Sequence, residues 1–222
     1  SSDYHGTDNN RSFIGLAPIA HISINHNTAT AVYPDGTSDR KPLTPDFTMA
    51  DAFNSFLAHF HIEGEYAHYC GLYGYTAFNA IRYLEPVQVP DSCDPKNDAP
   101  DAIYILYRYL IVFHGHESEM VLVGLKGEGE TGHIGDVERA VNVWIPYGRA
   151  RQQSFTDDEH RANIRRGIAH CLKGDVFQIV LSRRFVQRYE GDDFAVYRAL
   201  RSINPSPYLF YFDFGGYRLF GS

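Results

Sequence analysis

Hydrophobic and polar residues alternate near the start of the chain, a pattern typical of strands that bury one face. The stretch 12–32 (SFIGLAPIAHISINHNTATAV) follows it and ends at a Pro-Asp-Gly turn at 34–36. We therefore predict two antiparallel strands there. The segment 69–75 (YCGLYGY) predicts a further strand, in which Gly71 and Gly74 let another backbone or a large ring come close.

Two more apolar runs, 102–113 and 120–125, surround His114-Gly115-His116 and predict a second pair of strands. Helical spacing appears over 44–60, where apolar residues recur at intervals of three and four. A short helix is predicted over 77–84. This first region is therefore expected to be an antiparallel sheet with one or two helices.

The second half of the chain contains strong helix signals. Thr156 and Glu159 have capping-box spacing, and Gly174 is placed to end the helix after Lys173. The run 176–185 (VFQIVLSRRF) is rich in β-branched residues and predicts a strand.

After that strand, Asp192 is expected to cap a helix over 193–203, which two prolines end. The segment 208–220 reads as a hairpin around Gly215-Gly216.

These elements predict an α+β fold of antiparallel sheets with helices. We divide the chain into a first region, 1–125, a polar, glycine-rich connecting segment, 126–155, and a second region, 156–222. One short helix is expected inside the connecting segment, over 136–143.

The composition excludes several classes of partner. A net charge of −7 and a pI near 5.8 argue against nucleic acid and anionic membranes as partners. Three cysteines without metal-type spacing indicate neither a disulfide framework nor a zinc site, which suits a cytoplasmic protein. No apolar run approaches the ~20 residues that cross a bilayer.

Three local patterns have both a functional and a structural interpretation. Residues 127–132 spell GxGxxG, but the two glutamates inside it would repel a pyrophosphate, which favours a solvated loop. The pairs His59/His61 and His114/His116 have spacing that suits a metal on a strand, yet no further ligand lies at metal spacing. We interpret them as surface or half-buried histidines.

Two other segments are candidates for ligand binding. Arg183 and Arg184 are candidates for holding a small carboxylate, although an outward-facing structural role is the commoner one for adjacent strand arginines. In 204–211 (NPSPYLFY) the prolines leave carbonyls without local N–H partners, and aromatic residues follow. An aromatic amino acid would suit such a site, while a packed turn is the structural alternative.

Several of these segments resemble the large subunit family of anthranilate synthases, component I. The similarity is carried by GDVFQIVLSRRF at 174–185 and RALRSINPSPYLFYFDFGG at 198–216, and it extends through RSFIGLAP at 11–18 and CGLYGY at 70–75. The family fold has two antiparallel sheets packed face to face with helices outside. The resemblance therefore implies the same α+β fold here.

The resemblance also implies a feedback-inhibitor site for L-tryptophan. Family members form it from a serine motif near the amino terminus and from the Asn-Pro-Ser-Pro-Tyr segment. The matching positions in this chain are Ser1, Arg11, Asn204, Pro207, Tyr208 and Leu209.

The family converts chorismate and ammonia to anthranilate and pyruvate, with ammonia supplied from glutamine by an amidotransferase subunit. Its Mg²⁺ ligands and catalytic residues match no position here. We therefore expect the amino-terminal part of such a subunit, inactive alone and without catalytic or metal-binding residues. Two alternatives stay open, a fragment of another chorismate enzyme, such as aminodeoxychorismate synthase, and a non-enzymatic amino-acid-binding module.

Overall fold

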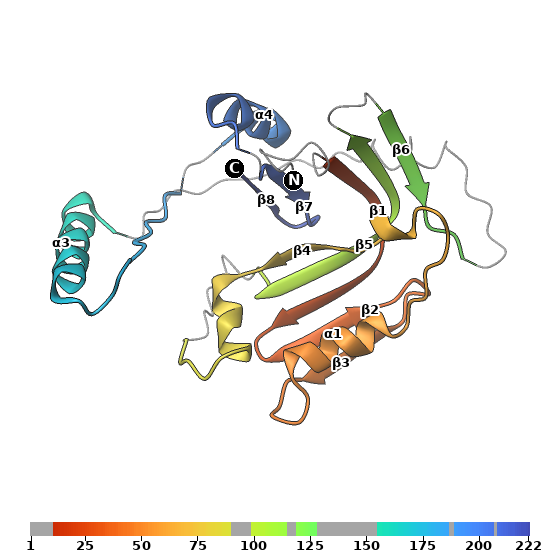
Figure 1. The fold of residues 1–222 in the computed structure, drawn as a ribbon, viewed down its shortest axis with the longest axis horizontal. Helices are drawn as coiled ribbons and strands as arrows, with labels where there is room; N and C mark the ends of the chain where they lie inside the picture. Colours follow the sequence, from red (N-terminus) through yellow and green to blue (C-terminus); the bar gives the residue numbers. More distant parts are fainter. Residues whose placement is uncertain (1–10, 90–98, 115–118, 128–154, 187–188, 207) are drawn as a thin grey trace. The chain divides into compact units, whose positions relative to one another are not determined.

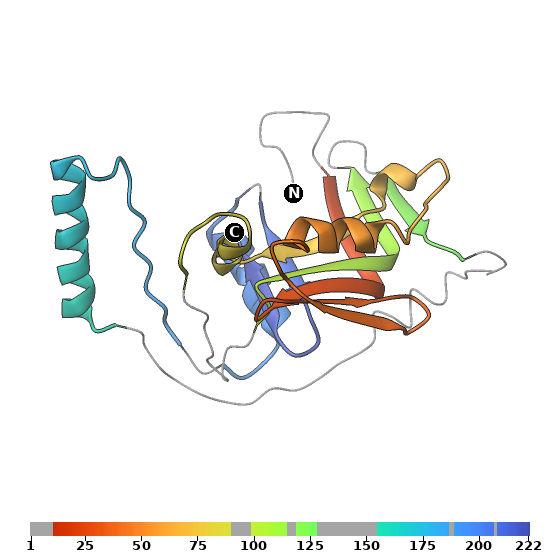
Figure 2. The ribbon, with the colours of Figure 1, turned by 90° about the horizontal axis from the view of Figure 1, so that it is seen from below.

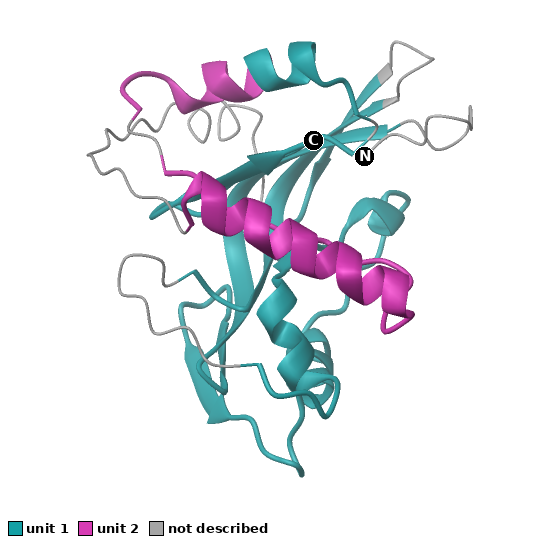
Figure 3. Ribbon diagram, turned by 90° about the vertical axis from the view of Figure 1, so that its left-hand side faces the viewer, with its two compact units in different colours: residues 1–143, 199–222 teal, residues 144–198 magenta. Residues whose placement is uncertain are grey.

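The computed structural model describes residues 11–89, 99–114, 119–127, 155–186, 189–206 and 208–222. The chain forms two units, which Figure 3 distinguishes by colour. Unit 1 comprises residues 1–143 and 199–222, and unit 2 comprises residues 144–198. The predicted connecting segment 126–155 and its short helix fall almost entirely outside the described residues, so those boundaries stay a prediction.

A six-stranded antiparallel sheet forms the centre of unit 1 (Figure 1). The long strand β1 pairs with β2 on one side, as the alternating pattern predicted, and with β5 on the other. The order is β3-β2-β1-β5-β4, and β6 pairs with β5. The strands are β1 (Arg11–Asn25), β2 (Thr28–Val32), β3 (Ser38–Pro42), β4 (Leu72–Thr76), β5 (Ala102–His114) and β6 (Glu119–Gly124).

Strand β1 and the turn that follows it show two departures from regular strand geometry. His26 and Asn27 both have positive φ, 45° and 54°, which gives the tight two-residue turn whose twist suits a hairpin. The register between β1 and β5 shifts between Pro18 and Ala20, next to Ala17 at φ 55°. A bulge of this kind bends a strand.

Helix α1 (Met49–Leu57) packs on the sheet and closes the main core (Figure 2). Thr48 caps it by accepting from the Asp51 backbone, and the Asp51 carboxylate accepts from the Thr48 backbone in return. Ile22, Ile24 and Phe56 are at most 1% exposed at this contact. The helix is shorter than the predicted 44–60 because the cap at Thr48 sets its start.

Two short 3₁₀ helices replace parts of the predicted elements. Residues 69–71 were expected to begin a strand, but Tyr69 ends η1 (Ala67–Tyr69), and β4 starts only at Leu72. The predicted helix over 77–84 is η2 (Phe78–Tyr83), a 3₁₀ rather than an α-helix. The apolar pattern located both segments but not the tighter winding.

Unit 2 contains α3 (Asp157–Lys173), with the predicted capping box and Gly174 at φ 84° as its left-handed C-cap. The predicted strand over 176–185 is wrong for 176–184, which belong to no strand in the structure. Ile179 and Leu181 face Gly167 of α3 instead. These side chains pack on a helix, and that contact replaces the expected strand pairing.

Helix α4 (Asp193–Ile203) begins where Asp192 accepts a hydrogen bond from the Phe194 backbone at 3.0 Å, as predicted. The predicted hairpin follows it as β7 (Phe210–Asp213) and β8 (Arg218–Gly221). The Phe214 ring, in the loop between them, packs edge-on against Tyr75 of β4 at 5.5 Å between centroids. The α+β class with antiparallel sheets is confirmed.

Candidate functional site

Four side chains gather at the start of β1, and we call them the Arg11 cluster: Arg11, Phe13, Tyr69 and Tyr73. The guanidinium carbon of Arg11 lies 5.5 Å from the centroid of the Tyr69 ring, a cation–π distance. The Phe13 ring lies 6.3 Å from that of Tyr69 and 5.9 Å from that of Tyr73. The predicted basic residue is thus set on an aromatic wall.

This wall is held rigidly by burial and by a hydrogen bond. Tyr69 is only 8% exposed, and the Tyr73 hydroxyl donates to the Tyr69 carbonyl at 2.8 Å. Burial raises the pKa of Tyr73, so this hydroxyl keeps its proton near neutral pH. Sequence reasoning placed 69–75 on a strand but did not identify Tyr69 or Tyr73 as partners of Arg11. The signal available in the sequence was that Tyr69 and Tyr73 are aromatic residues close together along the chain.

The segment 204–209 continues from the end of α4. The Asn204 backbone donates to the Leu200 carbonyl at 2.8 Å, and its side-chain amide donates to the Ser222 hydroxyl. Tyr208 is 65% exposed, and its backbone N–H donates to the Ser206 hydroxyl at 3.2 Å. Leu209 is half-buried. This segment therefore presents an exposed phenol beside a partly covered apolar side chain.

The structure places only part of the predicted tryptophan site. Arg11 is placed against Tyr69, and Asn204 against Ser222 at the end of β8. Ser1 and Pro207 lie outside the described residues. The six-residue site therefore stays a prediction, for which the structure supplies the surroundings of Arg11, Asn204, Tyr208 and Leu209.

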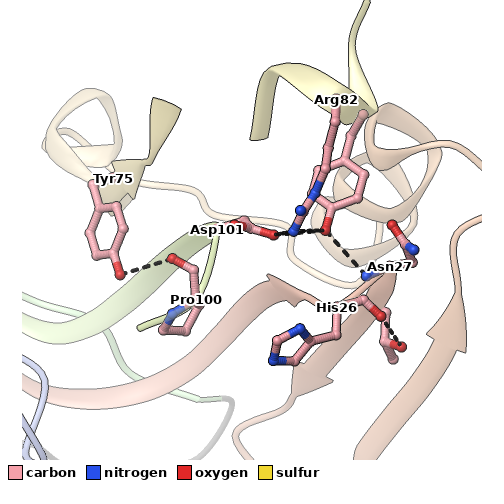
Figure 4. A network of polar contacts seen from close by, with 8 residues as sticks. His26, Asn27, Tyr75, Arg82, Pro100 and Asp101 are labelled. Carbon is pink, nitrogen blue, oxygen red and sulfur yellow. Dashed lines mark hydrogen bonds and ion pairs between the residues drawn. The ribbon is translucent and has the colours of Figure 1, made fainter. Parts of the chain in front are cut away.

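A buried polar network links three distant segments of unit 1 (Figure 4). Asp101, 6% exposed, accepts hydrogen bonds from the Arg82 guanidinium and from the Tyr83 hydroxyl. The same Tyr83 oxygen accepts from the Asn27 backbone in the β1–β2 turn, at 3.2 Å. The network fixes η2 to the residue just before β5 and to this turn, so we assign it a structural role.

The described residues contain no metal site, and the nucleotide candidate lies almost entirely outside them. Within the described ranges, no three His, Cys, Asp or Glu side chains converge to hold a metal ion. His59 bonds the Ser55 carbonyl and His61 bonds Glu63, both at 2.8 Å, as local surface contacts. The GxGxxG pattern falls on residues the structure does not describe, apart from Gly127. Nor does any helix of the described chain have the length and apolarity needed to cross a membrane.

Arg183 has a structural partner in its own unit. Its guanidinium donates to Asp157, at the start of α3, at 2.6 Å and lies 4.7 Å from the Phe185 ring centroid. The side chain is 11% exposed, against 68% for Asp157. The Arg183 hydrogen bond and charge hold the pKa of Asp157 below its ordinary value. The structural interpretation of Arg183 thus has direct support.

We expect Arg183→Gln to raise the pKa of Asp157 toward its ordinary value, because the largest stabilising contact of the charged form is lost. The carboxyl carbon of Asp157, followed by NMR through an acid titration, reports the change. Arg161→Gln is the matched control, since Arg161 acts on Asp157 through charge alone and more weakly. An unchanged Asp157 midpoint in Arg183→Gln would show that the ion pair does not form in solution.

A small pocket lies elsewhere in unit 1, between α1 and strands β1 to β3. Its lining is mostly apolar, includes the aromatic side chains of Tyr33, Phe47 and Phe56, and contains the charged pair Asp39 and Lys41. It contains none of the predicted site residues.

Comparison with known proteins gives a consistent family result. A family model described as chorismate binding enzyme matches residues 2–222. Anthranilate synthase component 1 of Aquifex aeolicus is 29% identical over 175 residues, which is 68% of this chain and 34% of that protein. The chloroplastic anthranilate synthase alpha subunit 1 of Oryza sativa subsp. indica is 28% identical over 239 residues, covering 92% of this chain and 41% of that protein.

A solved structure shows the same fold. The crystal structure of anthranilate synthase component I from Streptococcus pneumoniae matches with a TM-score of 0.65 and 22% identity, over 95% of this chain and 49% of that one. The chain therefore spans well under half the length of these curated relatives, 34% and 41%.

Proposed function

Since the chain belongs to the chorismate-binding enzyme family, we propose that it is the amino-terminal part of an anthranilate synthase large subunit. The observation that carries the proposal is the family match over residues 2–222, together with relatives named anthranilate synthase on both bacterial and plant sides. The full subunit would convert chorismate and ammonia to anthranilate and pyruvate, with loss of water, in tryptophan biosynthesis.

The chemistry would take place outside the segment described here. No cluster of acidic side chains among the described residues suits Mg²⁺, so the ligands of this ion would belong to the remainder of the subunit. A glutamine amidotransferase subunit would supply the ammonia. By itself this stretch would be inactive, since catalytic groups cannot act from a distance.

The role proposed for this stretch is tryptophan feedback. Arg11 would pair its guanidinium with the ligand carboxylate, and the buried Tyr69 ring beneath it would hold the guanidinium in place. Tyr208 and Leu209 would contact the indole ring, while the proline-rich carbonyls of 204–207 would accept from its ammonium group. Ser1 and Asn204 would complete the polar contacts.

The test is anthranilate fluorescence from the full subunit with chorismate, MgCl₂ and NH₄Cl, at increasing tryptophan concentrations. We expect Arg11→Ala to raise the half-inhibitory tryptophan concentration about 10- to 100-fold, because a charge-assisted bond to the carboxylate is lost. Arg40→Ala, on the exposed edge strand β3, is the control and should leave it unchanged.

Three outcomes would contradict these assignments. Formation of aminodeoxychorismate in place of anthranilate would contradict the enzyme assignment. Anthranilate formation that tryptophan does not affect would contradict the feedback site alone. Synthesis of anthranilate by residues 1–222 without the remainder would contradict their proposed inactivity.

A further inference from the structure

Strand β4 contacts both the Arg11 cluster and the hairpin β7–β8. Tyr73 and Tyr75 lie two residues apart, so their side chains leave the strand on the same face. Tyr73 packs against Phe13 and bonds the Tyr69 carbonyl. Tyr75 contacts the Phe214 ring and the Tyr217 hydroxyl, both in the loop region between β7 and β8.

The direction of the hydrogen bonds at Tyr75 follows from its partners. Its hydroxyl lies 3.0 Å from the Pro100 carbonyl, which can only accept, so Tyr75 donates there. The Tyr217 hydroxyl, 2.8 Å away, must then donate to Tyr75. Burial and this bond both raise the pKa of Tyr217, in keeping with its role as donor. Both hydroxyl protons are therefore donated, and the contact between Tyr75 and Tyr217 has one defined hydrogen-bond arrangement.

The hairpin at this junction is also tied to the proposed tryptophan segment. Strand β7 starts at Phe210, directly after Tyr208 and Leu209. The end of β8 pairs with the start of β7, and just after it the Asn204 amide donates to the Ser222 hydroxyl. A displacement of 204–209 therefore acts on both strands at the open end of the hairpin, and the paired strands connect this end to the loop that contacts Tyr75.

Strand β4 itself leaves little room for adjustment between the two tyrosines. A side-chain carbon at Gly74 would lie 1.8 Å from the Ile103 carbonyl oxygen, so the two backbones are in close contact there. We therefore expect a shift at Tyr73 to reach Tyr75 along the strand.

We propose that the Tyr75–Tyr217 hydroxyl pair is a positioning contact that couples tryptophan binding at the Arg11 cluster and 204–209 to the conformation of the β7–β8 hairpin. Neither tyrosine need touch tryptophan or chorismate. This inference rests on the proposed function, because it names the contact through which that site would regulate the enzyme. The coupling is the free energy by which bound tryptophan changes the binding of chorismate, and bound chorismate changes the binding of tryptophan by the same amount.

The experiment measures the coupling in the full subunit. Chorismate KM is determined in ammonia-dependent assays without tryptophan and at saturating tryptophan, and the ratio of the two is the coupling factor. Tryptophan Kd is measured separately by calorimetry without chorismate. We expect Tyr217→Phe to lower the coupling factor about three- to ten-fold, the effect of one hydrogen bond, and to leave Kd within about two-fold.

Tyr104→Phe provides a matched control. It also removes one side of a hydroxyl–hydroxyl pair between β4 and β5, with Thr76 at 2.9 Å, but on the face that α1 covers. The coupling factor should not change in this variant. Tyr75→Phe should match Tyr217→Phe, and the double variant should add nothing further, because both changes break the same contact.

Different results overturn different statements. If folded Tyr217→Phe keeps an unchanged coupling factor while tryptophan still inhibits the wild type, the proposed coupling through the Tyr75–Tyr217 pair is wrong and the tryptophan site is not affected. A weaker tryptophan Kd with an unchanged coupling factor also contradicts the proposed coupling, since the Tyr75–Tyr217 pair would then contribute to tryptophan binding itself. If tryptophan does not bind to the wild-type subunit, the proposed tryptophan site is wrong, and so is the coupling through the Tyr75–Tyr217 pair. Should Tyr75→Phe fail to fold, Tyr217→Phe decides, because it retains the Tyr75–Pro100 bond.

Discussion

Asp101→Ala is expected to lower the free energy of unfolding of the chain by about 3–5 kcal/mol, the usual cost of leaving one partner of a buried ion pair behind. Asp101 and Arg82 have side chains only 9% and 10% exposed, so solvent compensates little of the lost charge. Tyr83 also loses its acceptor, although its oxygen still holds the Asn27 backbone. Urea denaturation followed by circular dichroism measures the change.

Asp39→Ala is the control for this measurement. Asp39 also pairs with a cation, Lys41, at 3.0 Å, but these side chains are 47% and 54% exposed. An exposed pair contributes at most about 1 kcal/mol, so the control should stay within that range. Equal losses of unfolding free energy in the two variants would mean that burial does not make the Asp101–Arg82 pair more important for stability than the exposed Asp39–Lys41 pair.

The local features of the fold were predictable from the sequence because their causes lie within a few residues. The capping box of α3 needs only Thr156 and Glu159, and the structure confirms it. Gly174 and Gly215 have positive φ where the sequence placed a helix end and a hairpin turn. The Asp101 network was not predictable, since its partners come from Arg82, Tyr83 and the turn at Asn27, far apart along the chain.

The candidate site was predictable in part, and for a different reason. Arg11 was identified by family resemblance, and the segment 204–209 by its prolines and aromatic residues as well as by that resemblance. Neither kind of argument says anything about their neighbours in space. Tyr69 and Tyr73 meet Arg11 and Phe13 only because η1 and β4 are folded against β1. The prediction of a strand over 176–185 was wrong for a similar reason, because an apolar run does not indicate whether its residues will pack on a helix or pair with another strand.

Close backbone contact at glycine was also expected in the segment 69–75, and the structure separates its two candidates. A side-chain carbon on Gly71 would meet nothing within 4 Å. On Gly74 it would lie 1.8 Å from the Ile103 oxygen and 2.8 Å from two further backbone atoms of β5. Backbone atoms of a paired strand cannot move aside as a side chain can. Only Gly74 therefore requires the absence of a side chain.

We therefore expect Gly74→Ala to lower the free energy of unfolding by at least about 3 kcal/mol, the upper range for overpacking, because β4 must separate from β5 to accept the methyl group. Gly71→Ala, one residue before β4, should change the free energy of unfolding by less than about 1 kcal/mol. Thermal unfolding of both variants measures the difference. Separation of β4 would also move Tyr75, so Gly74→Ala should weaken protection of the Tyr75 amide in hydrogen exchange. Equal stability of the two alanine variants would show that the β4–β5 contact is looser than the structure has it.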